Sequence, residues 1–413
     1  MTSFAYRDGS LRCEGVSIPE IVAEVGTPLY IYSAAAIRTA FAALDGAFAG
    51  SPHTLHYALK ANSSLGVLRL LRSLGAQADA NSGGEIAVAR RAGFAPAEIV
   101  FTGVGKTVEE LDQAVGLGLK AINIESDGEA DRLDRLARAR GVKARVALRV
   151  NPDIDPNTHA LISTGQRFNK FGVPIEHAPA VLRELARRPG LELVGLHVHL
   201  GSQIVEMAPL SRAAHALAGL AQEARAMGLR LRHLDLGGGL GIAYDGAAPP
   251  DPQLYADAIA PIVQATGLDL LIEPGRYLVG PAGILVGTIA DVKCYPGSPR
   301  FLVLDTGMTE LIRPALYQAY HRIAAVTPRD GAEQDYEVVG PLCETSDTLG
   351  HQRRLGPVEV GDTMAVFDAG AYGIVMASNY NRRRLPAEVL VDHGRWRTIR
   401  QRQSYDDLMA REV

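Results

Sequence analysis

The chain has 413 residues, of which 47% are hydrophobic and 21% are charged, and its 42 basic and 46 acidic side chains give a formal net charge of −4. That length is enough for one large domain and a smaller one, and the composition is that of an ordinary globular protein. The charges are balanced and no run of Lys or Arg stands out. The sequence therefore lacks the basic patch that is typical of proteins that bind nucleic acid or an anionic membrane.

The N-terminus, the hydropathy and the cysteines indicate a protein that is not exported. Residues 1–20 include Arg7 and Asp8 and hold no apolar block, so we expect no signal peptide. The longest uncharged apolar stretch, residues 277–290, is too short and too rich in Gly and Pro to span a bilayer. Three scattered cysteines are too few, and odd in number, for a disulfide framework. We therefore expect the reducing cytoplasm.

Strand-like runs alternate with helical patterns, such as Leu65–Leu74 and Leu210–Met227, from about residue 54 to residue 276. Strand followed by helix, repeated eight times, predicts an α/β fold of the (β/α)8 TIM-like barrel type. An open, doubly wound sheet is the alternative, but it rarely needs eight such units in one run. The expected strands are Thr54–Leu59, Gln77–Ala80, Ile99–Thr102, Ala121–Glu125, Ala144–Val150, Val194–Leu200, His233–Leu236 and Leu270–Glu273.

After Pro281 the pattern changes to strands separated by Gly, Pro and Asp turns, with one helical segment at Pro314–Ala324. This predicts a second, mainly antiparallel β domain. The first 25 residues do not fit a barrel unit, and we expect them to pair with that domain. The expected division is therefore 1–25, 26–280 and 281–413. The expected strands of the second domain are Gly283–Lys293, Phe301–Asp305, Tyr336–Val339, Thr363–Asp368 and Glu388–Asp392.

Two loops suggest a bound phosphate. Barrels often hold phosphate with the loops after strands seven and eight, which here contain Gly237–Gly239 and Gly275–Arg276. Glycines let backbone N–H groups approach an anion closely, and an arginine adds a charged fork. The alternative is that a triple glycine only makes a tight turn, but the arginine in the neighbouring loop favours a phosphate.

Lys60 ends the first apolar strand. A lysine is usually a solvated surface residue, but one buried near a cofactor phosphate is what a Schiff base to pyridoxal 5′-phosphate requires. That cofactor withdraws electrons only while its ring nitrogen is protonated, and an adjacent carboxylate such as Glu273 favours that cation. His199 could stack on the ring or be a hydrogen-bonded core histidine, and His197 is a weaker candidate because it lies deeper in its strand.

Five motifs together resemble the pyridoxal-phosphate decarboxylases of the alanine-racemase fold, which include ornithine, arginine and diaminopimelate decarboxylases. The motifs occur in the family's order between about residues 26 and 392, so the resemblance covers nearly the whole chain. They are Tyr57–Asn62, His199–Ser202, Gly237–Gly239, Glu273–Tyr277 and Gly340–Glu344.

The resemblance implies a role for each matching residue, and it implies no metal site. Lys60 would bind the cofactor covalently, Glu273 would pair with the ring nitrogen, and His199 would stack on the ring. Residues that would orient these groups are Asp79, Glu85 and Arg149. Residues that would surround the phosphate are Ser202, Gly237, Gly238, Gly239, Gly275, Arg276 and, from the C-terminal domain, Tyr372.

The same resemblance implies a homodimer whose active sites form between subunits. Cys343 would return a proton to the Cα atom after CO2 leaves, and with Glu344 it would serve the partner's lysine. The other cysteines, Cys13 and Cys294, carry no such motif, and we interpret them as small buried hydrophobes.

The charges favour diaminopimelate as the substrate. Three stretches resemble those of diaminopimelate decarboxylases: Ile162–Gly165 with Lys170–Gly172, Arg313–Tyr317 and Cys343–Asp347. The far end of that substrate carries both a carboxylate and an ammonium group. Arg276 and Arg313 could bind the carboxylate with Tyr317 and Tyr372, and Glu344 could accept from the ammonium. Ornithine would leave two arginines without a partner, and such a mismatch discriminates by roughly 10⁴-fold.

Two other functions compete with this hypothesis. An amino-acid racemase shares the barrel and the lysine, but it needs a second base on the opposite face, and the Cys343–Glu344 motif argues against it. A regulatory homologue that has lost its cofactor is the other alternative, and the presence of every expected anchor argues against it.

Overall fold

The computed structural model describes residues 3–155, 164–165, 169–244 and 249–413, and it divides into two compact units. We call Phe41–Ile242 with Pro249–Tyr277 the barrel unit, and Met1–Ala40, Ala243–Ala248 and Leu278–Val413 the β unit. The domain boundaries expected after residues 25 and 280 divide the chain differently, and they stay a prediction. Within the described residues, no helix is both long and apolar enough to cross a membrane.

The barrel unit contains the predicted (β/α)8 barrel. Its eight strands are parallel, in the order β9-β11-β12-β13-β5-β6-β7-β8, and the pairing of β8 with β9 closes the ring. All eight expected strands are present, each shifted by at most a few residues. They are β5 (His53–Ala58), β6 (Gln77–Ala80), β7 (Ile99–Phe101), β8 (Ala121–Ile124), β9 (Ala144–Asn151), β11 (Leu191–His197), β12 (His233–Asp235) and β13 (Asp269–Ile272).

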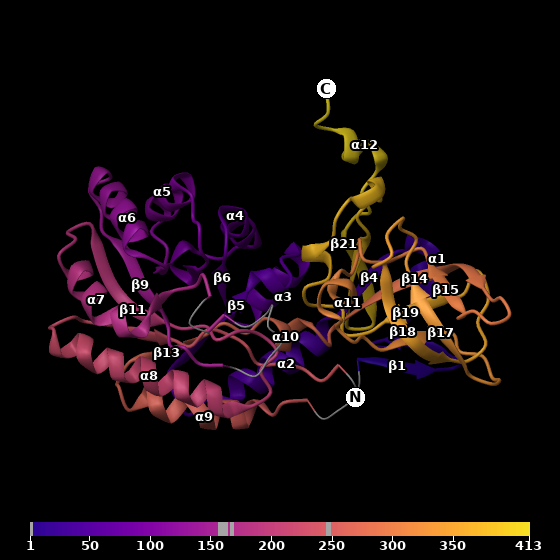
Figure 1. Cartoon of the computed structure of the whole chain (residues 1–413), viewed down its shortest axis with the longest axis horizontal. Coiled ribbons are helices and arrows are strands. Elements are labelled where there is room, and N and C mark those ends of the chain that lie inside the picture. The colour runs from indigo at the N-terminus through magenta and orange to yellow at the C-terminus, as the bar shows by residue number, and fades with distance from the viewer. Residues whose placement is uncertain (1–2, 156–163, 166–168, 245–248) are drawn as a thin grey trace. The chain divides into compact units, whose positions relative to one another are not determined.

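Helices cover the outside of this ring (Figure 1). Several begin at a hydroxyl that accepts a backbone N–H, as Ser82, Thr107 and Ser126 do, which satisfies a donor that the first helical turn leaves open. The helices are α3 (Leu65–Ser73), α4 (Gly83–Ala92), α5 (Val108–Leu117), α6 (Asp127–Ala139), α7 (Ala178–Ala186), α8 (Met207–Ala226) and α9 (Pro252–Gln264).

The interior of the barrel is unusually polar. Barrel interiors are usually filled by branched aliphatic side chains. Here several titratable side chains on the strands are fully buried instead: His56, Asp79, His197 and Asp235. Burying such groups costs free energy unless they interact with one another, so their arrangement determines the chemistry of the site.

The β unit is built on a mixed sheet in which an N-terminal strand lies between two C-terminal ones. Strand β4 (Leu29–Ser33) pairs antiparallel with β14 (Gly283–Lys293) and parallel with β20 (Ala387–Asp392). The complete order is β18-β17-β15-β14-β4-β20-β21, and β19 joins it through β14. The other strands are β15 (Phe301–Leu304), β17 (Gln334–Val339), β18 (Thr348–Leu355), β19 (Thr363–Val366) and β21 (Arg395–Arg400).

One predicted element is wrong in extent. The helix expected over Pro314–Ala324 is α11, which covers only Arg313–Tyr317. Gln318 adopts a left-handed conformation with φ 52°, which ends the helix, and the chain then enters strand β16 (Ile323–Ala325). Tertiary pairing of β16 with β19 therefore overrides the helical pattern of the sequence.

Candidate active site

Strand pairing brings Lys60 next to Asp79. Ala58, the last residue of β5, is the register partner of Asp79 on β6, and the short helix Leu59–Ala61 then turns Lys60 toward it. The Lys60 Nζ lies 3.7 Å from Asp79 Oδ2. The aspartate is fully buried, whereas the lysine side chain keeps 30% of its exposure. The lysine therefore stands at the end of the strand with its amine held near a buried acid.

Two further groups fix the loop after β6. Asn81 donates from its side chain to Asp79 Oδ2 at 3.1 Å, and its backbone N–H donates to Glu85 Oε2 at 2.7 Å. Burial, and then the charge of Glu273, raise the pKa of Asp79. Burial also raises the pKa of Glu85 to about 7, against the backbone hydrogen bond from Asn81. Glu85 thus acts on the site through the backbone of the loop.

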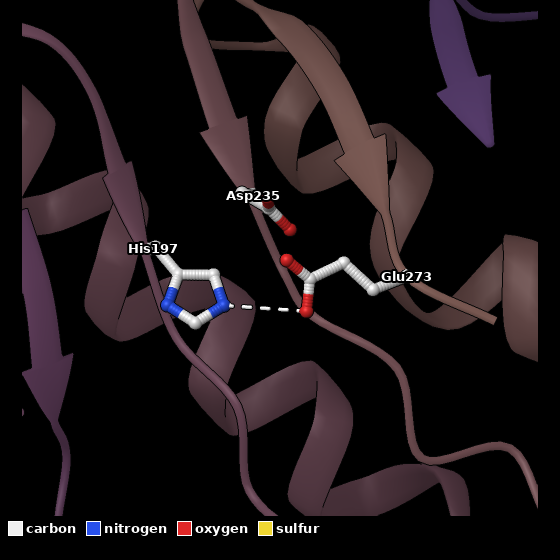
Figure 2. A group of neighbouring side chains, drawn as sticks. All are labelled: His197, Asp235 and Glu273. Atoms are coloured by element: carbon white, nitrogen blue, oxygen red, sulfur yellow. Dashed lines mark ion pairs between the residues drawn. The ribbon is translucent and has the colours of Figure 1, made fainter. Parts of the chain in front are cut away.

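Glu273 is the buried acid that follows β13. The Thr102 hydroxyl donates to its Oε1 at 3.4 Å, and its Oε2 lies 3.5 Å from His197 Nε2. Figure 2 shows one oxygen of this carboxylate facing His197 and the other facing Asp235. Burial alone would raise the pKa of Glu273, but His197 and then Lys60 oppose burial, and the net effect lowers this pKa. Glu273 is therefore ionised although it is almost completely buried.

The glycine loop after β12 packs against the neighbouring strand ends. A Cβ at Gly238 would lie 2.1 Å from the carbonyl oxygen of Glu273, and one at Gly237 would lie 2.6 Å from that of Val198. The Gly237 N–H donates to Asp235 Oδ1 at 2.9 Å, and the Gly238 N–H donates to His199 Nδ1 at 3.1 Å. These two N–H groups are therefore already used within the barrel.

His199 is held as a neutral ring. Burial, followed by the charges of Lys60 and Arg149, lowers the pKa of His199 well below its usual value. Because Nδ1 accepts from the Gly238 N–H, the proton of the neutral ring is on Nε2. A neutral, oriented imidazole at a strand end can lie flat against a planar ligand without charge repulsion.

Arg276 and Ser202 join the loops after β13 and β11. The guanidinium donates to the Ser202 hydroxyl from Nη2 at 2.9 Å and from Nε at 3.3 Å. Arg276 is buried and follows directly after Gly275. The pair offers a positive charge and a hydroxyl group together, which suits a phosphate.

Arg149 forms a buried ion pair with Glu125. Its Nη1 donates to Glu125 Oε1 at 2.7 Å, both side chains are buried, and the Gly172 N–H donates to Glu125 Oε2 at 2.7 Å. The guanidinium also lies 4.7 Å from the centre of the Phe171 ring. Arg149 therefore ties β9 to the Lys170–Gly172 stretch. Of the companion stretch Ile162–Gly165, residues 162 and 163 lie outside the described part of the chain.

In the β unit, Arg313 is fixed by aromatic and histidine contacts. Its Nη1 donates to His321 Nε2 at 2.7 Å, and His321 Nδ1 donates to the carbonyl of Phe367 at 2.8 Å. The guanidinium lies 4.6 Å from the centre of the Tyr244 ring. Tyr317, on the same helix as Arg313, is half-buried, as is Tyr372.

The loop that carries Cys343 and Glu344 is pinned by Asp347. This carboxylate accepts the N–H of Met308 at 2.6 Å and that of Leu342 at 2.9 Å, and its own N–H donates to the Glu344 carbonyl. Cys343 and Glu344 are exposed on the β unit. Hydrogen bonds to Asp347 thus hold the loop in place, while Cys343 and Glu344 are exposed on it.

The other two cysteines differ in burial. Cys13 is buried as expected, but the expectation that Cys294 is buried is wrong, because Cys294 is exposed just after the end of β14.

Sequence reasoning missed the buried partners of Glu273. His197 and Asp235 are register partners on β11 and β12, and Thr102 follows β7. His197 lies two residues before His199, the spacing of residues on one face of a strand, although β11 ends at His197. The positions were therefore visible in the sequence, but their contact with Glu273 depends on the register of three strands.

These residues fit pyridoxal phosphate. Glu273 Oε2 is a buried anionic oxygen that forms a 3.5 Å ion pair with His197 but accepts no hydrogen bond from the described residues, so it can accept one from a protonated ring nitrogen. A lysine amine, a neutral imidazole and an arginine–serine pair lie at the strand ends of the same barrel. The set supplies a covalent anchor, a ring contact and an anion contact.

Comparison with known proteins gives a consistent result. Residues 34–280 match the sequence model of the family described as pyridoxal-dependent decarboxylase, pyridoxal binding domain. The chain is 45% identical over 412 residues to the diaminopimelate decarboxylase of Pseudomonas aeruginosa, covering 100% of this chain and 99% of the relative.

Solved structures are similar over the same length. The diaminopimelate decarboxylase from M. jannaschii in complex with L-lysine has a TM-score of 0.94 and 35% identity, covering 100% of this chain and 98% of that one. The Helicobacter pylori diaminopimelate decarboxylase complexed with L-lysine has a TM-score of 0.92 and 38% identity, covering 95% of this chain and 98% of that one.

The Glu85 carboxyl makes the stability of the protein depend on pH. Its pKa of about 7 in the folded protein lies above its ordinary value, so between the two the folded state keeps a proton that the unfolded chain has lost. The resulting stabilisation is complete below the ordinary pKa and is lost as the pH rises through 7. We expect the Tm of the wild type, relative to Glu85→Gln, to fall over this range in circular-dichroism melts.

Glu110→Gln is the matched control, because backbone hydrogen bonds from Gly83 and Thr107 lower the pKa of Glu110. Its contribution should be lost as the pH falls, which is the opposite direction. A Tm difference between wild type and Glu85→Gln that stays constant from pH 4 to pH 8 would contradict the assigned environment of Glu85.

Proposed function

Because the chain belongs to the diaminopimelate decarboxylases within the pyridoxal-dependent decarboxylase family, we propose that it removes one carboxylate from meso-2,6-diaminopimelate and yields L-lysine and CO2. This is the last step of lysine biosynthesis. The observation that carries the proposal is the match over the full chain, at 45% identity, to an enzyme of that name. The geometry of the barrel rim supports the part of the proposal that concerns the cofactor.

The barrel rim supplies the groups that hold pyridoxal phosphate. The cofactor, when bound, accepts the electron pair that the departing CO2 leaves on Cα. Lys60 would anchor it covalently through Nζ, and Glu273, ionised by its neighbours, would hold a proton on the ring nitrogen. His199 contributes a neutral face for the ring. Asp79, beside Lys60, and Glu85 and Arg149, through their loops, keep these groups in place.

The phosphate would be bound by Arg276, Ser202, Gly239 and Gly275, and the resemblance adds Tyr372. Arg276 supplies the charge and Ser202 the hydroxyl, and their mutual hydrogen bonds orient both. Gly237 and Gly238 contribute in a different way, because their N–H groups are bonded to Asp235 and His199. Because neither residue has a Cβ atom, the loop can pack closely against the backbone of Glu273 and Val198.

The distal end of the substrate requires both signs of charge. Arg313 and Arg276 bind the distal carboxylate with the help of Tyr317 and Tyr372, and Glu344 accepts from the distal ammonium. The support for Arg313 is that His321 and Tyr244 fix its guanidinium, which lowers the entropy lost on binding. Holding the distal end fixes the orientation of the bond that breaks.

Cys343 completes the reaction by donating its thiol proton to Cα after CO2 leaves. We assign Cys343 and Glu344 to the active site of a partner subunit in a homodimer, as in the resemblance described above. Their exposure on a loop that Asp347 holds rigid supports this assignment. The three free cysteines agree with a reducing cytoplasm.

Release of CO2 from a panel of amino acids tests the proposed reaction. We expect the purified protein to release CO2 from meso-diaminopimelate at least 10⁴-fold more efficiently, in kcat/KM, than from ornithine, arginine or lysine, because mismatched polar groups discriminate on about that scale. Lys60→Ala should lose both CO2 release and the visible absorbance of the bound cofactor. Lys143→Ala, which changes an exposed lysine, should keep both. Turnover by Lys60→Ala, or comparable turnover of ornithine, would reject the proposal.

Substitution of Arg313 tests the distal pocket. We expect Arg313→Ala to cost about 2–5 kcal/mol in kcat/KM for diaminopimelate, because the distal carboxylate loses a buried partner. Arg322→Ala removes an exposed arginine of the same segment and should leave kcat/KM unchanged. If both variants behave like the wild type, Arg313 does not contact the substrate.

A further inference from the structure

Two buried groups lie beside Glu273. His197 helps to keep that acid ionised, whereas Asp235 has no role in the proposed chemistry. His197 and Asp235 are fully buried. A ring nitrogen of His197, a carboxylate oxygen of Asp235 and a carboxylate oxygen of Glu273 all lie within 4.8 Å of one another. The arrangement follows from register: His197 pairs with Asp235 across β11 and β12, and the Glu273 N–H donates to the Gly237 carbonyl two residues after Asp235. The side chains of the three strand ends therefore converge in the barrel interior (Figure 2).

Asp235 has one oxygen satisfied and one directed at Glu273. Its Oδ1 accepts from the Gly237 N–H at 2.9 Å. Its Oδ2 is buried and has no hydrogen-bond partner among the described residues. Figure 2 shows the Asp235 carboxyl pointing toward a Glu273 oxygen. A buried acceptor facing another acceptor is unfavourable unless a proton lies between them.

The surroundings decide which of the two acids holds that proton. Burial, and then the charge of Glu273, raise the pKa of Asp235 well above its usual value. His197 and Lys60 outweigh burial at Glu273 and lower its pKa. The other titratable or charged groups that act on the pair are Asp79 on β6, His199 after β11, Lys120 before β8 and Tyr255 on α9. His56 and His233, on neighbouring strands, have pKa values lowered to about 3, so neither can hold the proton.

We propose that Asp235 is a positioning residue that stays protonated and donates a hydrogen bond to the Glu273 carboxylate. Because the proton is on Asp235, the single negative charge of the pair is on Glu273. The hydrogen bond from Asp235 fixes the plane of the Glu273 carboxylate. The remaining lone pairs of Glu273 can then meet the ring nitrogen of pyridoxal phosphate. The inference rests on the proposed function for the cofactor, but the protonation of Asp235 belongs to the polypeptide alone.

Two substitutions test whether Asp235 acts as a neutral hydrogen-bond donor or as a carboxylate anion. Asp235→Asn keeps the shape, keeps an oxygen for the Gly237 N–H, and supplies an amide N–H to Glu273. Asp235→Leu removes the donor and keeps the branched shape, with a somewhat larger side chain. If Asp235 is a neutral donor, the asparagine variant should retain pyridoxal phosphate with nearly the wild-type Kd and absorbance spectrum. The leucine variant should bind about 10- to 150-fold more weakly, as expected when a hydrogen bond to a charged group is lost.

Infrared difference spectroscopy of the cofactor-free protein reads the proton directly. At pH 7 the wild-type spectrum minus that of Asp235→Asn should contain the carbonyl stretch of a protonated carboxylic acid. A carboxylate band in its place would overturn the inference, and so would an asparagine variant that loses the cofactor as completely as the leucine variant. If the leucine variant does not fold, the infrared spectrum still decides.

Two more measurements distinguish failure of this inference from failure of the proposed function. If the wild type itself retains no pyridoxal phosphate, the proposed function is wrong, whereas the infrared result continues to report on Asp235. Metal analysis of the purified holoenzyme should find no stoichiometric ion that Asp235→Asn loses. Such an ion would mean that His197, Asp235 and Glu273 bind a cation and would overturn the shared proton.

Discussion

The buried negative charge of Glu273 is the constraint on which the rest of the site depends. Removing a carboxylate from water costs several kcal/mol unless neighbours compensate for it. Here the compensation comes from other strand ends, with His197 Nε2 at 3.5 Å and the Thr102 hydroxyl at 3.4 Å. A closed parallel barrel brings the carboxyl ends of all its strands to one rim, so residues far apart in the chain can supply these contacts. The fold therefore makes an ionised acid tolerable where a protonated ring nitrogen needs one.

The same contacts connect the groups around Glu273 into one unit. The Glu273 N–H donates to the Gly237 carbonyl at 2.7 Å, and the Gly238 N–H orients His199. The acid, the glycine loop and the imidazole thus hold one another, which reduces the reorganisation needed when a ligand arrives. The β unit prepares its own groups in the same manner, because His321 fixes Arg313 and Asp347 fixes the loop of Cys343.

The sequence predicts the barrel because its signals are local. Apolar runs bounded by polar strand ends predict all eight strands, and the reactive and charged residues follow directly after these strands. The ion pair of Arg149 with Glu125 and the grouping of His197 with Asp235 could not be predicted, because they depend on strand register. The helix expected over Pro314–Ala324 failed for a related reason, since pairing of β16 with β19 decides that segment.

Reduction with borohydride followed by peptide mapping tests the central claim most directly. Borohydride converts the bond between pyridoxal phosphate and a lysine amine into one that survives proteolysis. The account predicts a single modified peptide, with the pyridoxyl group on Lys60. A tag on another lysine of the active protein, with Lys60 unmodified, would contradict the assignment of the barrel rim as the cofactor site.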